Sequence, residues 1–184
     1  LAMLPFHHIY PLIGSVIASL HFGITIVMID KVSSEEILKS LNNNRVTIFL
    51  SVPRLYNLFH RNIMHELKSN KFYHLLFKIM KYINIPKLKR LIFKKVHNKF
   101  GGNIKYLTSG GAKIDFEVAQ DLYTMGFNFY EGYGLTETSP LVSICMSEIS
   151  NKFDSVGKVL SINEIQIVDG EIAVRGPNVM LGYY

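Results

Sequence analysis

The sequence predicts an α/β fold, with a largely parallel sheet and flanking helices, followed by the start of a small β subdomain. Short runs rich in β-branched and aromatic residues alternate with helix-like runs over residues 1–140, as in parallel sheets. Over residues 141–184 the helix-like patterns stop. There EIQIVDGEIAVRG predicts two strands joined at Asp169-Gly170, because this dipeptide is a strong hairpin signal.

Length and composition fit a globular domain. The 184 residues suffice for one hydrophobic core, and 48% hydrophobic with 18% charged residues excludes a disordered chain. The single cysteine, Cys145, excludes a disulfide framework and a cysteine metal cluster. These features indicate a cytoplasmic protein, and both ends of the sequence suggest a piece of a longer chain.

Five short runs are expected to form strands: residues 1–5, 24–29, 46–51, 104–109 and 127–132. Between the first two, PLIGSVIASLHFG predicts a buried helix that begins at Pro11 and ends at Gly23. Residues 9–29 are also about long enough to span a bilayer. Proline, glycine and histidine interrupt them, which favours a helix followed by a buried strand.

Three further helices have recognisable starts. Ser33 and Glu36 have the spacing of a capping box. Pro53 is expected to open a helix with apolar residues on one face. Asp115 is placed to cap a helix that ends at Gly126.

Positive charge is concentrated in residues 67–114, which contain twelve lysine or arginine residues and no aspartate or glutamate. Apolar residues at helical spacing predict a basic helical insertion at about 67–100, with a second helix opened by Pro86. The expected apolar positions are Phe72, Leu75, Leu76, Ile79, Ile83, Leu88, Leu91, Ile92 and Val96. Such helices either cover a core with a solvated face or contact an anionic membrane; nucleic acid is not expected, because no binding motif accompanies the charge.

The stretch EGYGLTETSP, residues 131–140, follows a predicted strand and is either a plain turn or a nucleotide site. In open α/β sheets, ligands bind beyond the carboxyl ends of strands. There the ring of Tyr133 can stack on a base, and Gly132 and Gly134 let the backbone approach a ligand. The hydroxyl of Thr136 can donate to phosphate, while Glu137 suits Mg²⁺ shared with phosphate oxygens.

Two other stretches lie at predicted strand ends. TSGGAKI offers nearly bare backbone at Gly110, Gly111 and Ala112, which suits a flat ring, although it is also a plain loop before a helix. LPFHHIYPL places His7 and His8 between a strand and a helix, where no further ligands indicate a metal.

With these motifs the chain resembles the adenylate-forming acyl-CoA synthetases of the AMP-binding superfamily. EGYGLTETSP resembles the family's Y-G-x-T-E signature, TSGGAKI its adenine loop, and LPFHHIYPL its L-P-x-x-H segment. VDGEIAVRGPNVMLGYY resembles the later glycine- and tyrosine-containing stretch. The long basic insertion before TSGGA is similar to that of long-chain fatty acyl-CoA synthetases, which make acyl-AMP and pyrophosphate from fatty acid and ATP and then acyl-CoA.

The resemblance implies an adenine site built from two loops. Gly111 and Ala112 would line the base, and Tyr133 would stack on it. Glu131 would meet its amino group.

The same resemblance implies roles around the reacting groups. Thr136 would contact phosphate and Glu137 would hold Mg²⁺. His8 would lie near the carboxylate of the acid, while the backbone around Gly132 and Gly134 would border the acyl entrance. ATP, Mg²⁺, CoA and a fatty acid are the implied ligands.

The family's upstream phosphate loop, its ribose-binding aspartate and its C-terminal lid with the catalytic lysine do not occur in these residues. We therefore expect this stretch alone not to catalyse. Two alternatives stay open: another adenylating enzyme, such as an acyl-carrier-protein ligase, and a catalytically silent module that keeps the fold.

Overall fold

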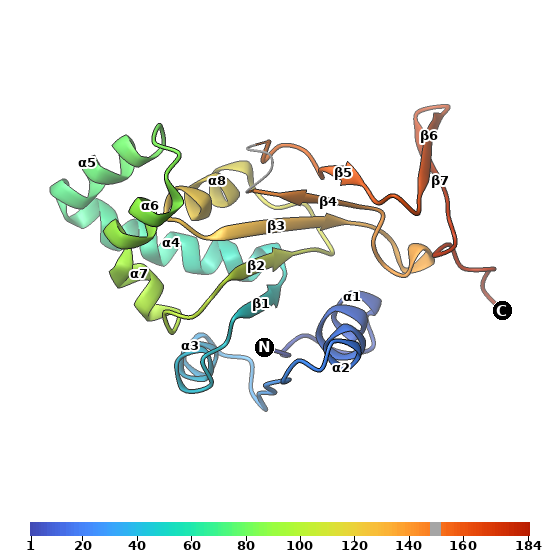
Figure 1. The fold of residues 1–184 in the computed structure, drawn as a ribbon, viewed down its shortest axis with the longest axis horizontal. Coiled ribbons are helices and arrows are strands. Elements are labelled where there is room, and N and C mark those ends of the chain that lie inside the picture. Colours follow the sequence, from blue (N-terminus) through green and yellow to red (C-terminus); the bar gives the residue numbers. More distant parts are fainter. Residues whose placement is uncertain (148–151) are drawn as a thin grey trace.

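The computed structural model describes residues 1–147 and 152–184. Five strands form one mixed sheet in the order β1-β2-β3-β4-β5, with helices around it, and two further strands form a separate hairpin (Figure 1). The predicted α/β class is confirmed.

The first three strands of the sheet are parallel. They are β1 (Ile48–Ser51), β2 (Tyr106–Ser109) and β3 (Asn128–Tyr133). Their carboxyl ends lie together, since Ser51 pairs with Ser109 and Ser109 with Glu131. This register brings the 110–112 loop beside the chain that follows β3.

The sheet continues past residue 140, where a separate β unit was expected to begin. β4 (Ser143–Met146) returns antiparallel to β3, and β5 (Lys158–Val159) pairs with β4. Within the described residues, the separate β unit is the hairpin of β6 (Glu164–Val168) and β7 (Glu171–Arg175). Asp169 and Gly170 both have positive φ, so the predicted two-residue turn is confirmed.

The expected strands at 1–5 and 24–29 are wrong. The described chain shows there a single bridge between Ala2 and Met28, and residues 24–29 are exposed or half-buried. A strand requires a hydrogen-bonded partner along its length, and β-branched composition does not supply one.

The segment after residue 8 is helical, but it is not a buried helix. It runs through α1 (Ile9–Pro11), a π-helical stretch η1 (Leu12–Ile17) and α2 (Ala18–His21), and only Pro11 and Ser15 are buried. Gly23 has positive φ after its end, as expected. Among the described residues, no helix combines the length and apolarity needed to cross a bilayer.

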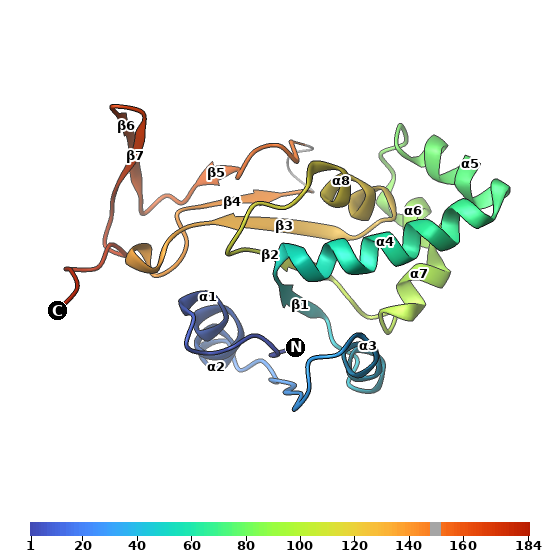
Figure 2. The same cartoon turned by 180° about the vertical axis from the view of Figure 1, so that it is seen from behind.

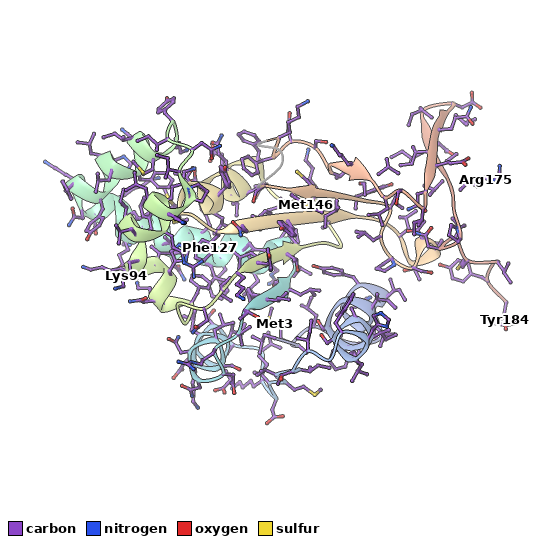
Figure 3. All side chains as sticks on the ribbon, viewed as in Figure 1. Met3, Lys94, Phe127, Met146, Arg175 and Tyr184 are labelled. Atoms are coloured by element: carbon purple, nitrogen blue, oxygen red, sulfur yellow. The ribbon has the colours of Figure 1, made fainter. Side chains whose placement is uncertain are left out.

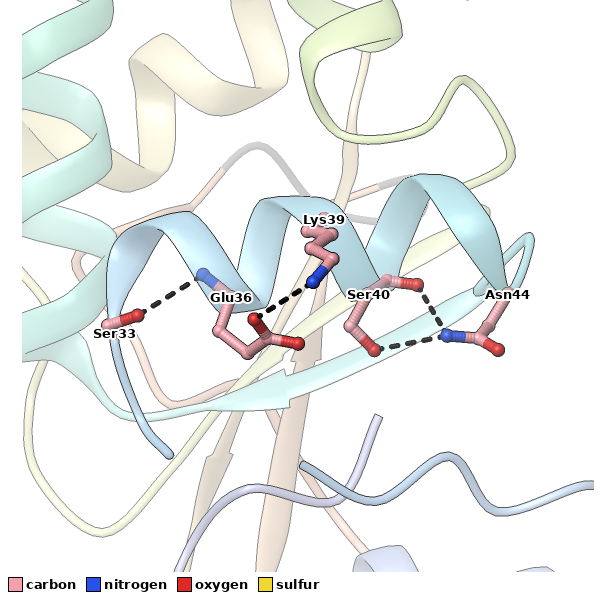
Figure 4. Close-up of polar contacts among 5 residues, drawn as sticks. All are labelled: Ser33, Glu36, Lys39, Ser40 and Asn44. Carbon is pink, nitrogen blue, oxygen red and sulfur yellow. Dashed lines mark hydrogen bonds and ion pairs between the residues drawn. The ribbon is translucent and has the colours of Figure 1, made fainter. Parts of the chain in front are cut away.

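Helix α3 (Ser34–Asn43) has half of the predicted capping box (Figure 4). The Ser33 hydroxyl accepts a hydrogen bond from the backbone N–H of Glu36 at 3.2 Å. The Glu36 carboxylate instead lies 3.6 Å from Lys39 Nζ, so it supports the next turn of the helix.

Helices α4 (Pro53–Ser69) and α8 (Phe116–Thr124) lie on one face of the sheet (Figure 2). The buried hydroxyl of Tyr56 donates to the carbonyls of Phe49 and Thr108, which ties α4 to β1 and β2. Figure 3 shows side chains filling this layer around Phe127, whereas Lys94 points outward. Pro53 opens α4 as predicted, but Asp115 makes no capping bond, because its carboxylate accepts from Asn57 Nδ2 at 2.8 Å.

The basic stretch forms α5 (Lys71–Met80), α6 (Pro86–Ile92) and α7 (Lys94–Lys99). Its predicted apolar face is partly wrong. Four of the expected residues are exposed, namely Phe72, Leu75, Ile79 and Leu91, while Phe77 and Met80 enter the core. α5 carries apolar residues on two faces, and spacing alone does not tell which face packs.

A buried carboxylate joins α4, α8 and the residue that follows α5. Asp121 Oδ2 lies 2.8 Å from His60 Nε2, and Asp121 Oδ1 lies 2.9 Å from Lys81 Nζ. Burial by itself would raise the pKa of Asp121, but the hydrogen bonds and charges of His60 and Lys81 outweigh it and lower that pKa.

The substitution Asp121→Asn is expected to lower the free energy of unfolding by about 2 kcal/mol at pH 7, less than for a fully buried pair because Lys81 is partly exposed. Since the folded-state pKa is depressed, this stability is present above a pH of about 4 and is lost as the pH falls through the folded-state pKa. Urea unfolding of both proteins across this range measures the difference. The exposed Glu117→Gln in the same helix is the control, and a difference that persists at low pH contradicts the prediction.

Candidate nucleotide-binding site

A pocket of about 480 Å³ opens at the carboxyl end of the parallel strands. Four segments line it: the chain around α1, Val52 directly after β1, the loop after β2 and the chain from the end of β3 onward. The lining includes His8, Gly111, Ala112, Gly132, Tyr133, Gly134, Thr136 and Glu137. All the predicted site residues except Glu131 are therefore brought together.

The end of β3 needs glycine because the chain turns back on itself. A Cβ atom on Gly134 would lie 1.7 Å from the Pro140 carbonyl oxygen. The backbone N–H of Val142 donates to the Tyr133 carbonyl at 2.8 Å, which closes this turn. The ring of Tyr133 is thereby held at the pocket wall by the sheet itself.

The turn places Thr136 and Glu137 in the 3₁₀-helix η2 (Thr136–Thr138). The buried Thr138 hydroxyl accepts from the Leu135 N–H at 2.9 Å and donates to the Leu135 carbonyl at 3.0 Å. The side chain of Thr138 makes the hydrogen bonds that stabilise the turn. The neighbouring Thr136 and Glu137 line the pocket. The Tyr183 hydroxyl donates to Glu137 Oε1 at 2.7 Å, which lowers the pKa of Glu137 and favours its charged form.

The stretch after β7 makes hydrogen bonds to the same turn. Asn178 Nδ2 donates to the carbonyls of Thr138 at 2.7 Å and Leu141 at 3.1 Å. The backbone N–H of Met180 donates to the Glu137 carbonyl at 2.8 Å. The stretch after β7 therefore holds the turn that carries Thr136 and Glu137.

The loop after β2 approaches the pocket with bare backbone. A Cβ atom on Gly110 would lie 2.9 Å from the Tyr10 ring, so the loop packs closely on that ring. The Tyr10 hydroxyl donates to the carbonyls of Ser51 and Thr108, and burial raises the pKa of Tyr10 to about 12. Gly111 has φ of +81° with open space around it, which leaves room for a flat ligand.

Glu131 lies outside the pocket lining. Its Oε1 accepts a hydrogen bond from the Ile114 N–H at 3.0 Å, and burial raises its pKa. The geometry gives Glu131 a role in holding the 110–114 loop against β3, and its contact with an adenine amino group stays a prediction.

His8 lines the pocket at the start of α1, with the His7 ring 4.3 Å from its own. Among the described residues, no group of three or more histidine, cysteine, aspartate or glutamate side chains is arranged to hold a metal. Glu137 is the only carboxylate in the lining of this pocket as described, and with the Thr136 hydroxyl it would suit Mg²⁺ shared with phosphate oxygens.

Sequence analysis missed Tyr10, Thr138, Asn178 and Tyr183. All four lie inside stretches quoted for the family resemblance, and Thr138 makes its hydrogen bonds within its own stretch. Asn178 and Tyr183 act across about 40 residues on the turn of η2, and no spacing rule predicts that contact.

The profile of the family described as "AMP-binding enzyme" matches residues 1–184. The chain belongs to this family. The match spans every segment of the pocket, so the Y-G-x-T-E resemblance is confirmed at the level of the family.

Several long-chain acyl-CoA synthetases are similar in sequence. Long chain acyl-CoA synthetase 6, peroxisomal, of Arabidopsis thaliana is 30% identical over all of this chain and 30% of its own length. The long-chain-fatty-acid–[acyl-carrier-protein] ligase AEE15, chloroplastic, of the same plant is 39% identical over 52% of this chain and 15% of its own. The chain thus spans about a third or less of these relatives.

Solved structures of adenylate-forming enzymes share the fold. O-succinylbenzoate coenzyme A synthetase from Bacillus subtilis, in complex with ATP and magnesium ion, has a TM-score of 0.66 and 25% identity over all of this chain and 33% of its own. The N-terminal domain of FACL13 from Mycobacterium tuberculosis has a TM-score of 0.68 at 17% identity, over 98% of this chain and 41% of its own. The latter likeness supports the fold alone.

Proposed function

We propose that this chain is part of a long-chain fatty-acid–CoA ligase. The whole enzyme activates a fatty acid with ATP and Mg²⁺ to acyl-AMP and pyrophosphate, and then transfers the acyl group to CoA. The observation that carries the proposal is the meeting of Tyr133, Thr136 and Glu137 with the bare 111–112 backbone in one pocket.

Each pocket group has a chemical task in this reaction. The Tyr133 ring offers a stacking surface for adenine, and Gly111 in the same pocket leaves open space for a flat ligand. The Thr136 hydroxyl donates to a phosphate oxygen, and His8 lies near the carboxylate of the acid. Placing the carboxylate beside the α-phosphate makes their reaction effectively unimolecular.

Glu137 is the group that would hold Mg²⁺, which neutralises charge on the phosphates when bound. The Tyr183 hydroxyl keeps the Glu137 carboxylate oriented and ionised. Fixed donors of this kind stabilise the charge that develops on phosphate in the transition state.

The AEE15 relative keeps a second acceptor open, because that protein is named as an acyl-carrier-protein ligase. A catalytically silent module is the remaining alternative. Neither the pocket nor the adenylation chemistry distinguishes CoA from a carrier protein, so the acceptor is decided by assay.

The test is carboxylate-dependent ATP–pyrophosphate exchange by the intact protein, with acids from acetate to long-chain fatty acids. Exchange with long-chain acids alone supports the proposal, and subsequent supply of CoA or acyl-carrier protein identifies the acceptor. Exchange with short or aromatic acids only would show that these acids, and not long-chain fatty acids, are the substrates. A folded protein without exchange on any acid would favour the silent module.

We further propose that residues 1–184 do not catalyse alone, because the family's phosphate loop and C-terminal lid do not occur in these residues. The measurement is acyl-CoA formation by the purified stretch, and measurable product contradicts the proposal. The cytoplasmic location stays a prediction; two relatives are named peroxisomal and chloroplastic.

The substitution Asn178→Ala is expected to slow adenylation about tenfold, because the turn that carries Thr136 and Glu137 loses two hydrogen bonds. The rate constant kcat falls, while the thermal midpoint changes little, since Asn178 is only half-buried. Single-turnover acyl-AMP formation measures the effect. Val179→Ala is the neighbouring control, and an unchanged kcat in Asn178→Ala would remove the positioning role.

A further inference from the structure

Helix α5 carries a row of large apolar side chains that the described chain leaves uncovered. Phe72 is 65% exposed, Leu75 56%, Ile79 43%, and Tyr82 in the following turn 91%. We call these four residues the α5 stripe. Their spacing of three, four and three residues places them on one side of the helix.

The stripe is separate from the side of α5 that packs. Phe77 and Met80 are buried in the core, and Tyr73 packs against it. Two adjoining sides of one short helix are thus apolar, and only one of them has partners among the described residues. Uncovered apolar side chains in a contiguous row mark an interaction surface.

Lysines border the α5 stripe on its far side. Lys71 and Lys78 are exposed and, by helical spacing, lie next to the stripe, away from the packed side. Lys81 differs, because it pairs with the buried Asp121. The surrounding residues 67–114 contain no aspartate or glutamate, so no acidic side chain of that stretch offsets these charges.

We propose that α5 is an interfacial helix that docks on an anionic lipid surface, with the α5 stripe among the acyl chains and Lys71 and Lys78 at the headgroups. An apolar row bordered by lysines is the arrangement of helices that lie in a membrane interface. A nucleic acid would use the charge but leave the stripe uncovered. A protein partner would cover the stripe, but binding to a protein does not require the uniform positive charge of residues 67–114.

The position of α5 fits this role. Helix α5 lies at the opposite end of the molecule from the β6–β7 hairpin (Figures 1 and 2). Docking at α5 therefore leaves η2 and its pocket away from the lipid surface, accessible to ATP. The inference concerns attachment and does not depend on which acid the pocket activates.

The test is co-sedimentation of the intact protein with vesicles of phosphatidylcholine, with or without phosphatidylserine. We expect binding that needs phosphatidylserine and weakens with salt. Lys71→Gln with Lys78→Gln lowers the partition constant about 25-fold, since each lysine near the surface contributes about fivefold. The triple change Phe72→Ser, Leu75→Ser, Ile79→Ser lowers it by a further tenfold or so, as insertion is lost.

Matched controls use exposed residues far from α5: Lys158→Gln for charge and Ile167→Ser, on the β6–β7 hairpin, for apolarity. Exchange activity without vesicles reports folding, because the changed residues lie outside the pocket. Hydrogen exchange should show protection of residues 71–82 on vesicle binding.

Three results would overturn the proposal. The first is equal binding to neutral and anionic vesicles at all salt concentrations. The second is loss of binding in the controls but not in the α5 variants. The third is unchanged hydrogen exchange of residues 71–82 on vesicle binding, which would place the lipid contact elsewhere. Failure of the pocket to support exchange would leave vesicle binding unaffected, so the two proposals fail separately.

Discussion

Replacing Glu137 with alanine should abolish ATP–pyrophosphate exchange by the intact protein, by at least about 10²-fold. Glu137 is the only carboxylate in the lining of the pocket as described, so its loss removes the anionic donor for Mg²⁺. Removal of one preorganised group that stabilises transition-state charge has effects of this size. The effect should appear in kcat for acyl-AMP formation.

Folding is not expected to suffer, because the Glu137 side chain is partly exposed and accepts its hydrogen bond from the exposed Tyr183. Tyr183→Phe is the matched control: it removes the hydroxyl that orients Glu137 and keeps the carboxylate. We expect a smaller loss, about tenfold or less, partly restored by raising Mg²⁺. If Glu137→Ala keeps the exchange activity of the unchanged protein, the carboxylate does not act in this reaction.

The substitution Gly134→Ala should be the most damaging change of a single atom in the site. Its Cβ would lie 1.7 Å from the Pro140 carbonyl oxygen, and backbone cannot yield as a flexible side chain does. The turn must open, which we expect to cost at least about 3 kcal/mol in the free energy of unfolding. Exchange should fall by more than 10²-fold, since Thr136 and Glu137 move with the turn.

Gly111→Ala is the informative comparison. Gly111 has φ of +81° but no atom near its would-be Cβ, so alanine there meets conformational strain and no clash. We expect a cost of about 1–2 kcal/mol. Urea unfolding and exchange assays on both variants separate the two effects. Equal, small losses of stability and exchange in the two variants would show that the turn around Gly134 adapts to a Cβ atom. That result contradicts the prediction that the turn between β3 and β4 is too tight for alanine.

Local patterns in the sequence determined much of this protein. Proline at residue 53, serine at 33 and Asp169-Gly170 act on their own neighbours, so their helix start, cap and hairpin turn follow from nearest-residue geometry. The strand-end motifs were also predicted to meet, because parallel strands share an edge at their carboxyl ends. That rule brought together the predicted residues of the chain after β2 and β3 except Glu131, whereas His8 reaches the pocket from the start of α1.

Only the tertiary structure decided features that depend on a distant partner. Residues 24–29 have strand composition, yet pairing is what makes a strand, and apart from one bridge at Met28 the described chain offers no partner. Glu131 lies outside the pocket lining, because its carboxylate accepts a hydrogen bond from the backbone N–H of Ile114. Helix α5 is apolar on two sides, and the side that carries Phe77 packs against the core. Periodicity fixes which side chains share a face, whereas the packing of other elements selects the face that is buried.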